Sequence, residues 1–167
     1  PVIAMARDRY ILRNYSPVVT IGGGEILYIH PRKHKRSTHI LTQMRTLKEG
    51  TLEDVLEIYV EHARFHPMTP WAIAGMLAVS PQNIVNRLRQ LIQQHVLINT
   101  AEHEIAVMHA RHYRTLSTML LHTLAEFHQT FPLKPGMDRE ELRTKLPAEL
   151  PLQVFQQLLD EQMHTGQ

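Results

Sequence analysis

The order of apolar and polar residues divides the chain into a short strand region and a longer helical region. Aromatic and β-branched residues fill 10–15, 18–21 and 26–29, a composition typical of strands. Ser16-Pro17 favours a turn between the first two, and the glycines at 22–24 allow a sharp bend or a close backbone approach. Because so few strands are marginally stable alone, we expect the end of a larger sheet here.

From about residue 50 the apolar residues recur every 3.6 positions, which predicts successive helices. Thr51 is positioned to cap the first helix, and Glu53 and Asp54 favour the positive end of its dipole. Thr69-Pro70 and Ser80-Pro81 each combine a cap with proline at the first helical position, which predicts two more helix starts. The expected buried faces are Leu52, Val55, Leu56, Tyr59, Val60 and Ala63, then Ile73, Ala74 and Leu77, then Ile84, Leu88, Leu91 and Ile92.

Two short apolar runs follow the third helix. Residues 96–98 and 105–108 flank a polar tip at 99–104, a pattern typical of a two-stranded ribbon. Three helices followed by such a ribbon form a winged helix-turn-helix. The sequence therefore predicts a mainly α fold with a winged helix at its centre.

A second unit repeats this order of helices. Asp138 and Glu141 resemble a capping box that opens its second helix, which ends near Leu146-Pro147, and Pro151 opens its third. The expected buried faces of its first and third helices are Leu116, Met119, Leu120, Leu124, Phe127 and Phe131, then Leu152, Phe155, Leu158 and Leu159. Corresponding helices lie roughly 60–70 residues apart, the mark of an internal repeat. This copy reaches residue 167 before any wing, so we expect a piece of a longer protein.

The amino-acid composition excludes several kinds of functional site. Apolar residues make up 43% and charged residues 20% of the chain, which suits a globular fold. There is no cysteine, which excludes disulfides, thiolate metal sites and a thiol nucleophile. The net charge is only +2, but Arg32, Lys33, Lys35 and Arg36 fall within five residues. That run can meet phosphate or serve as a solvated linker.

Two motifs resemble one protein family. The stretch DRYILRNYSPVVTIGGG at 8–24 is similar to the closing strands of the third domain of translational GTPases, and most of all to the bacterial selenocysteine-specific elongation factors. That family places winged-helix modules directly after its barrel, and its second module resembles PLKPGMDREELR at 132–143. Family members often carry an aspartate near the position of Tyr28, so this residue departs from the pattern.

The resemblance implies a domain organisation and a set of partners. It implies the last strands of an elongation-factor β-barrel at 1–30, a basic linker at 31–48, one winged helix at 49–109 and a second at 110–167, truncated before its wing. In the family, a domain preceding residue 1 would bind GTP and Mg²⁺, and a module beyond residue 167 would bind the mRNA hairpin. This chain has no phosphate-binding Gly-x-x-x-x-Gly-Lys-Ser/Thr loop, so we expect no enzyme activity and no cofactor in it.

The third helix of the first module occupies the recognition position. Asn83, Arg87 and Arg89 on its outer face are candidates for nucleic-acid contact, together with Arg32, Lys33, Lys35 and Arg36. Since only two charges lie on that helix face, a solvated amide-rich surface is the favoured interpretation, and direct nucleic-acid binding by this module is the alternative.

Histidine, tryptophan and tyrosine allow further interpretations. The pairs His62/His66 and His109/His112 have helical spacing, but zinc requires three or four ligands, so we expect no metal. Trp71, the only tryptophan, follows Pro70 at a helix start, and we expect it to be partly buried against the first helix. The alternative is a platform for base stacking, which needs exposure and basic surroundings. Alternation on a sheet accounts for Tyr10, Tyr15 and Tyr28.

The leading interpretation is a cytoplasmic fragment of a selenocysteine-specific elongation factor. Its winged helices would form a spacer, or a hinge, between the tRNA- and GTP-binding body and the mRNA-reading end, with weak RNA contact. The alternative is a DNA-binding transcriptional regulator with tandem winged helices. Because the opening strands lack their barrel, we also predict strand-mediated dimerisation or disorder of residues 1–30 in the isolated fragment.

Overall fold

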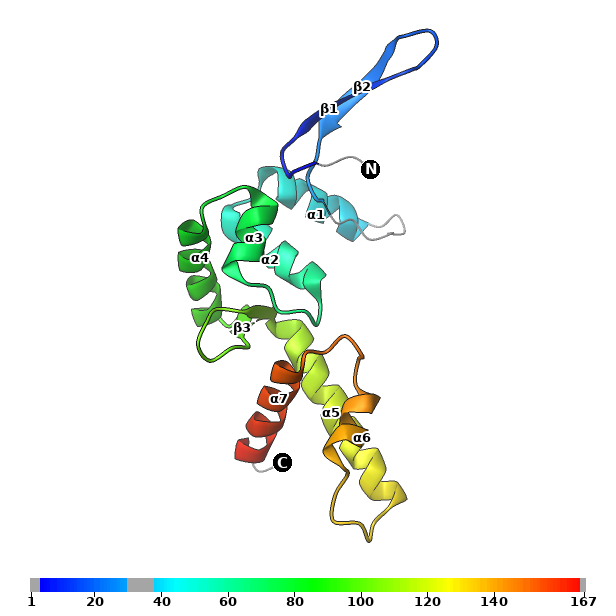
Figure 1. Ribbon diagram of the computed structural model, residues 1–167, viewed down its shortest axis with the longest axis vertical. Helices are drawn as coiled ribbons and strands as arrows, with labels where there is room; N and C mark the ends of the chain where they lie inside the picture. The colour runs from blue at the N-terminus through cyan, green and yellow to red at the C-terminus, as the bar shows by residue number, and fades with distance from the viewer. Residues whose placement is uncertain (1–3, 30–37, 166–167) are drawn as a thin grey trace.

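The computed structural model describes residues 4–29 and 38–165. Within them the chain is elongated, with a β-hairpin at one end, one helical module in the middle and another at the far end (Figure 1). The strands are β1 Arg9–Arg13, β2 Thr20–Glu25, β3 Leu97–Asn99 and β4 Val107–His109. The helices are α1 Thr38–Glu49, α2 Leu52–Ala63, α3 Pro70–Leu77, α4 Pro81–Gln93, α5 Ala110–Thr130, α6 Arg139–Lys145 and α7 Leu152–Thr165.

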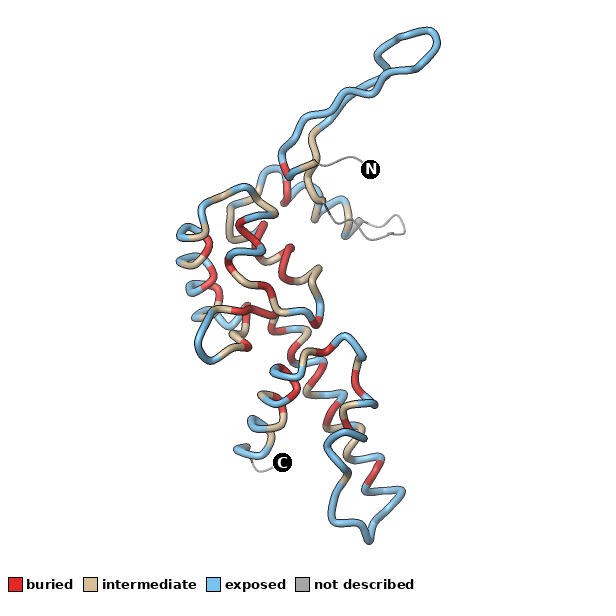
Figure 2. Tube along the Cα trace, in the orientation of Figure 1, coloured by how far each residue is buried: buried red, intermediate tan, exposed pale blue. Residues whose placement is uncertain are grey.

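The N-terminal hairpin differs from the expected strand pattern. β1 and β2 pair antiparallel, from Arg9 opposite Glu25 to Arg13 opposite Thr20, and the three glycines lie inside β2. Gly23 and Gly24 allow a close cross-strand approach rather than a bend, because a Cβ on Gly23 would come within 2.6 Å of the Tyr10 carbonyl oxygen and one on Gly24 within 2.8 Å of the Tyr10 hydroxyl. The hairpin is exposed over residues 9–24 (Figure 2).

The expected third strand at 26–29 is wrong. Leu27 and Tyr28 leave the hairpin and pack against α2 instead. The Tyr28 ring lies edge-on to Tyr59, with centroids 4.7 Å apart, and also edge-on to His62. Tyr28 therefore contributes to helix packing rather than to a sheet face, which gives a physical reason for an aromatic residue at this position.

The segment expected to be a linker, 31–48, contains most of α1. This helix packs on α2, and its Leu47 is buried beside Val55 and Ile58. Gln43 of α1 donates from Nε2 to the Glu61 carboxylate at 3.5 Å. α1 was not predicted, although Ile40, Leu41, Met44 and Leu47 recur at helical spacing, because the basic run before it favoured a linker over the whole segment.

The first module is a winged helix built from α2, α3, α4 and the β3–β4 ribbon, as expected. Thr51 forms a complete capping box with Asp54, and Thr69 caps α3. Ser80 opens α4 without a side-chain cap bond, since its hydroxyl donates to Gln82. Met68 adds a short bridge to Val107 beside the ribbon, which the sequence did not indicate. The core consists of Leu56, Val60, Met68, Ile73, Ala74, Ile84, Leu88, Leu91, Leu97 and Val107.

The second module contains α5, α6 and α7 around its own core. Asp138 caps α6 by accepting from the Glu140 and Glu141 amides. Of the expected buried residues, Met119, Phe131 and Leu152 are exposed, since they lie on the flank or at the end of a helix that no neighbour covers. Val154, which was not expected in the core, is fully buried there.

Candidate functional site

The recognition helix α4 presents a weaker cationic surface than its sequence suggests. Asn83, Arg87 and Arg89 are all exposed, as expected for contact residues. Arg87, however, forms an ion pair with Glu53 of α2, which offsets its charge. Arg89 thus remains as the cation of this face without a carboxylate partner among the described residues. The other basic candidates, Arg32, Lys33, Lys35 and Arg36, lie outside the described residues.

Trp71 lies at the start of α3 and is 74% exposed, so the expected partial burial is wrong. Pro70 and Ile73 occupy the inner side of the helix in its place. α3 is apolar on every side, so the apolar pattern alone did not indicate which side would be buried.

The histidines form polar contacts between elements. The Nε2 atom of His112 donates to the Glu61 carbonyl oxygen at 2.8 Å, which joins α5 to α2. His109 caps α5 by accepting from the Arg111 amide through Nδ1, and its Nε2 lies 3.4 Å from Glu57. Among the described residues no three histidine or acidic side chains form a group able to hold a metal ion.

The two modules are joined without a linker. β4 ends at His109, and α5 begins at Ala110. Phe65 and Met108, which belong to the first module in sequence, are buried in the core of the second. Arg111 adds an ion pair to Glu61 at 3.3 Å. The partners of that shared core are Tyr113, Leu116, Leu120, Leu142, Leu146, Leu150, Val154, Phe155 and Leu158.

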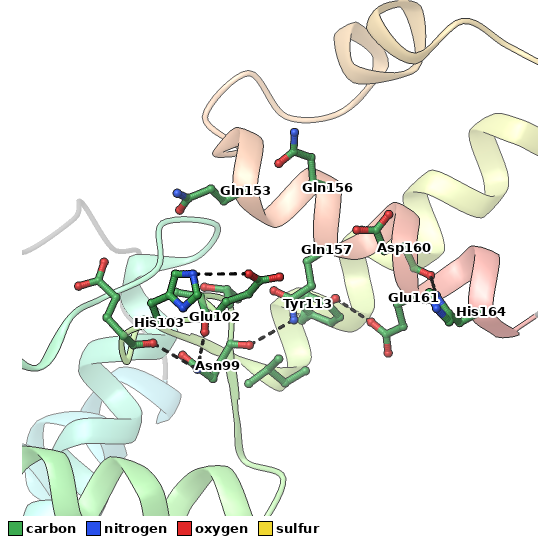
Figure 3. Close-up of a pocket in the computed structure, with 14 residues that line it drawn as sticks. Asn99, Glu102, His103, Tyr113, Gln153, Gln156, Gln157, Asp160, Glu161 and His164 are labelled. Carbon is green, nitrogen blue, oxygen red and sulfur yellow. Dashed lines mark hydrogen bonds and ion pairs between the residues drawn. The ribbon is translucent and has the colours of Figure 1, made fainter.

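A cleft of about 1090 Å³ lies between the ribbon tip of the first module and α7 of the second (Figure 3). The Tyr113 hydroxyl donates to the Glu161 carboxylate at 2.7 Å, and Gln157 donates to the Asn99 carbonyl oxygen at 3.2 Å. The charged and titratable side chains that line the cleft are Glu102, Glu104, Asp160, Glu161, His103 and His164, besides Tyr113. Because carboxylates repel phosphate, this side of the junction is unsuited to nucleic acid.

The pKa values of His112 and Tyr113 at the junction are shifted by their surroundings. Burial lowers the pKa of His112, its hydrogen bond to Glu61 opposes this, and the charges of His109 and Arg64 add to the lowering. Burial raises the pKa of Tyr113, and its bond to the Glu161 carboxylate raises it further. Both rings are therefore favoured in their neutral forms at the contact between modules.

The fold and this junction define a mainly α protein with tandem winged helices. Residues 121–167 match the sequence profile of a family described as "Elongation factor SelB, winged helix", a non-catalytic part of an elongation factor. The chain is also similar to the selenocysteine-specific elongation factor of Desulfomicrobium baculatum, with 25% identity over 142 residues. These two findings confirm the resemblance to selenocysteine-specific elongation factors that the motifs indicate.

The match covers most of this chain but a small part of the relative. The alignment covers 85% of this chain but 22% of the relative, so the chain spans about a fifth of the length of that protein. No helix in residues 4–29 and 38–165 has the length and apolar character needed to cross a bilayer.

Proposed function

We propose that this chain is the part of a selenocysteine-specific elongation factor that holds its mRNA-reading end at a fixed distance and orientation from its tRNA- and GTP-binding body. On this proposal GTP and Mg²⁺ bind elsewhere in the full-length factor, and these residues contribute no catalysis. The factor acts in the cytoplasm on selenocysteinyl-tRNA, an mRNA hairpin and the ribosome. The comparisons do not favour the alternative of a DNA-binding regulator.

One observation supports the spacer role above the others. A flexible connection between modules needs a linker, whereas here His109 of β4 is itself the cap of α5. Phe65 and Met108 are buried among residues of α5 and α7, so bending at the junction would expose apolar surface. Because the two modules share a core, the orientation of one module fixes the orientation of the other.

The proposed RNA contact of the first module is weak. Arg89 and Asn83, with the run Arg32, Lys33, Lys35 and Arg36, are the candidates, and Arg87 contributes less because Glu53 offsets its charge. So few free cations favour sequence-independent contact with phosphate over base reading.

A distance measurement between the modules tests the spacer. Because the chain has no cysteine, Gln90→Cys on α4 and Lys145→Cys on α6 create a unique pair of spin-label sites. We expect one narrow distance distribution. A short glycine insertion between His109 and Ala110 is the matched control and should broaden it. A wild-type distribution as broad as that of the insertion variant would rule out a fixed spacer.

The functional counterpart uses the full-length factor and a UGA read-through reporter. The same insertion should lower read-through while leaving GTP binding unchanged, because it alters geometry and not the nucleotide site. Unchanged read-through would mean that the orientation of the modules is irrelevant to decoding.

A further inference from the structure

The side chain of Glu61, near the end of α2, contacts both α1 and α5. Its Oε1 atom accepts from the Arg111 guanidinium of α5 at 3.3 Å. Its Oε2 atom accepts from the Gln43 amide of α1 at 3.5 Å. One carboxylate therefore joins the helix that precedes the first module to the helix that opens the second.

The backbone of Glu61 makes a further contact with α5. The last four carbonyl groups of a helix have no partner within it, and Glu61 is among the last four residues of α2. Its carbonyl oxygen accepts from the Arg64 amide at 3.2 Å and from Nε2 of His112 at 2.8 Å. Because Arg111 and His112 are adjacent in α5, their contacts hold the first turn of that helix at one place on α2.

Glu57 extends this face of α2 by one turn. Residues four apart lie on the same side of a helix, so Glu57 and Glu61 face the same neighbour. The Oε1 atom of Glu57 lies 3.4 Å from Nε2 of His109, the residue that caps α5. α2 thus presents two successive carboxylates to the start of α5, and these contacts define how α5 is turned about its axis.

Gln43 connects the end of α2 to α1 through both atoms of its amide. Its Nε2 atom donates to Glu61, and its Oε1 atom lies 3.4 Å from Nε2 of His62, the next residue of α2. The Tyr28 ring lies edge-on to the His62 ring, with centroids 5.1 Å apart. The segment that leaves the hairpin, α1 and α5 are therefore all in contact with Glu61 or His62.

These polar contacts supply orientation rather than stability. The Arg111 side chain is 70% exposed, so its ion pair with Glu61 adds little to stability. Phe65 and Met108, buried in the shared core, supply the apolar contact between the modules. Apolar contact has no preferred direction, whereas a hydrogen bond weakens steeply when its angle changes.

We propose that Glu61 positions the second module relative to α1, by holding Gln43 and Arg111 on its two carboxylate oxygens. This inference rests on the proposed function, because it names the residue through which the spacer keeps its orientation. The buried cores of the two modules contain none of these three side chains. Removing the contact therefore changes the angle between the modules and leaves each module folded.

Two pairs of spin labels separate the two sides of Glu61. Gln90→Cys on α4 with Lys145→Cys on α6 reports the angle between the modules, and Arg45→Cys on α1 with Lys145→Cys also reports the position of α1. Arg111→Glu places two carboxylates side by side, so it should broaden the distance distributions of both pairs toward that of the glycine-insertion variant. Gln43→Leu removes only the contact with α1, so it should broaden the second distribution and leave the first unchanged.

Rescue by exchange of the two charges distinguishes positioning from a general loss of structure. Glu61→Arg combined with Arg111→Glu restores the ion pair with reversed polarity, and the Gln43 amide oxygen can then accept from the new guanidinium. This double variant should return both distributions to the wild-type width. Glu53→Gln is the matched control, because that carboxylate pairs with Arg87 inside the first module, and it should change neither distribution.

Two kinds of failure are distinguishable. Distributions that stay narrow in Arg111→Glu, or that stay broad after the exchange of charges, would overturn the role of Glu61 and leave the spacer intact. A wild-type distribution that is already broad would overturn the spacer, and the role of Glu61 with it.

Discussion

Replacing Phe65 with alanine is the sharpest perturbation of the junction. Phe65 follows α2 of the first module, but its side chain is 5% exposed and lies in the core of the second module. If the modules share a core, this substitution should destabilise α5 and α7 although it is made in the sequence of the first module.

The magnitude follows from the burial of the ring. Removing a buried phenylalanine side chain costs about 3–5 kcal/mol, the sum of lost transfer energy and a residual cavity. The Phe65 ring lies 5.9 Å from the half-buried His112 ring, which can relax into part of the space. We therefore expect the lower part of that range, about 3–4 kcal/mol.

Amide hydrogen exchange in the native state resolves the two modules. A loss of about 3–4 kcal/mol corresponds to a fall of two to three orders of magnitude in the protection of α7 amides such as that of Leu158. Leu88→Ala is the control, because Leu88 is buried in the core of the first module only. It should reduce protection in α4 and leave α7 nearly unchanged.

A different pattern would refute the argument. If Phe65→Ala reduces protection in α4 alone while α7 keeps its wild-type rates, the modules fold independently and the shared core has no energetic role. The spacer proposal would then lose its main support.

Three further predictions concern other parts of the chain. Thr51→Ala should lower the free energy of unfolding in urea by about 1 kcal/mol. In the wild type the hydrogen bonds from Thr51 hold the pKa of Asp54 low, so the stability that they contribute is lost as the pH falls through that pKa. Equal acid sensitivity of the variant and the wild type would contradict this. The Tyr59 hydroxyl is buried without a hydrogen-bond partner among the described residues, so Tyr59→Phe should leave stability unchanged or raise it. Burial raises the pKa of Tyr59 from about 10 to about 12, so wild-type stability should decline as pH rises through that interval, and a variant with the same decline would exclude Tyr59 as its source. Ile11 and Ile21 are 67% and 70% exposed on the hairpin. Replacing both with lysine should abolish any self-association seen by sedimentation. A strictly monomeric wild type at high concentration would contradict strand-mediated dimerisation.

The sequence by itself determined the helices whose start signals are local. Thr51, Thr69 and Asp138 each accept from a backbone amide within three residues, so their capping bonds depend on no distant part of the chain. The ribbon of the first module was equally predictable, because its apolar runs and polar tip are contiguous. The family resemblance rests on short contiguous motifs as well.

Only the tertiary structure decided which faces meet. The three glycines continue a strand because they pair with residues 10–12 of β1, and Tyr28 packs on α2 instead of a sheet. Trp71 is exposed because α3 is apolar all round and only its other side faces the core. In each case the partner lies on another element, which neither periodicity nor capping can identify.

The contacts between the modules were beyond the sequence for the same reason. Glu61 and Arg111 are 50 residues apart, and no motif joins them, yet they form an ion pair at 3.3 Å. They meet because Phe65 and Met108 are buried in the core of the second module, which holds the end of α2 beside the start of α5. Local hydrogen bonding thus determined the elements, while burial of apolar side chains between the modules determined how the elements meet.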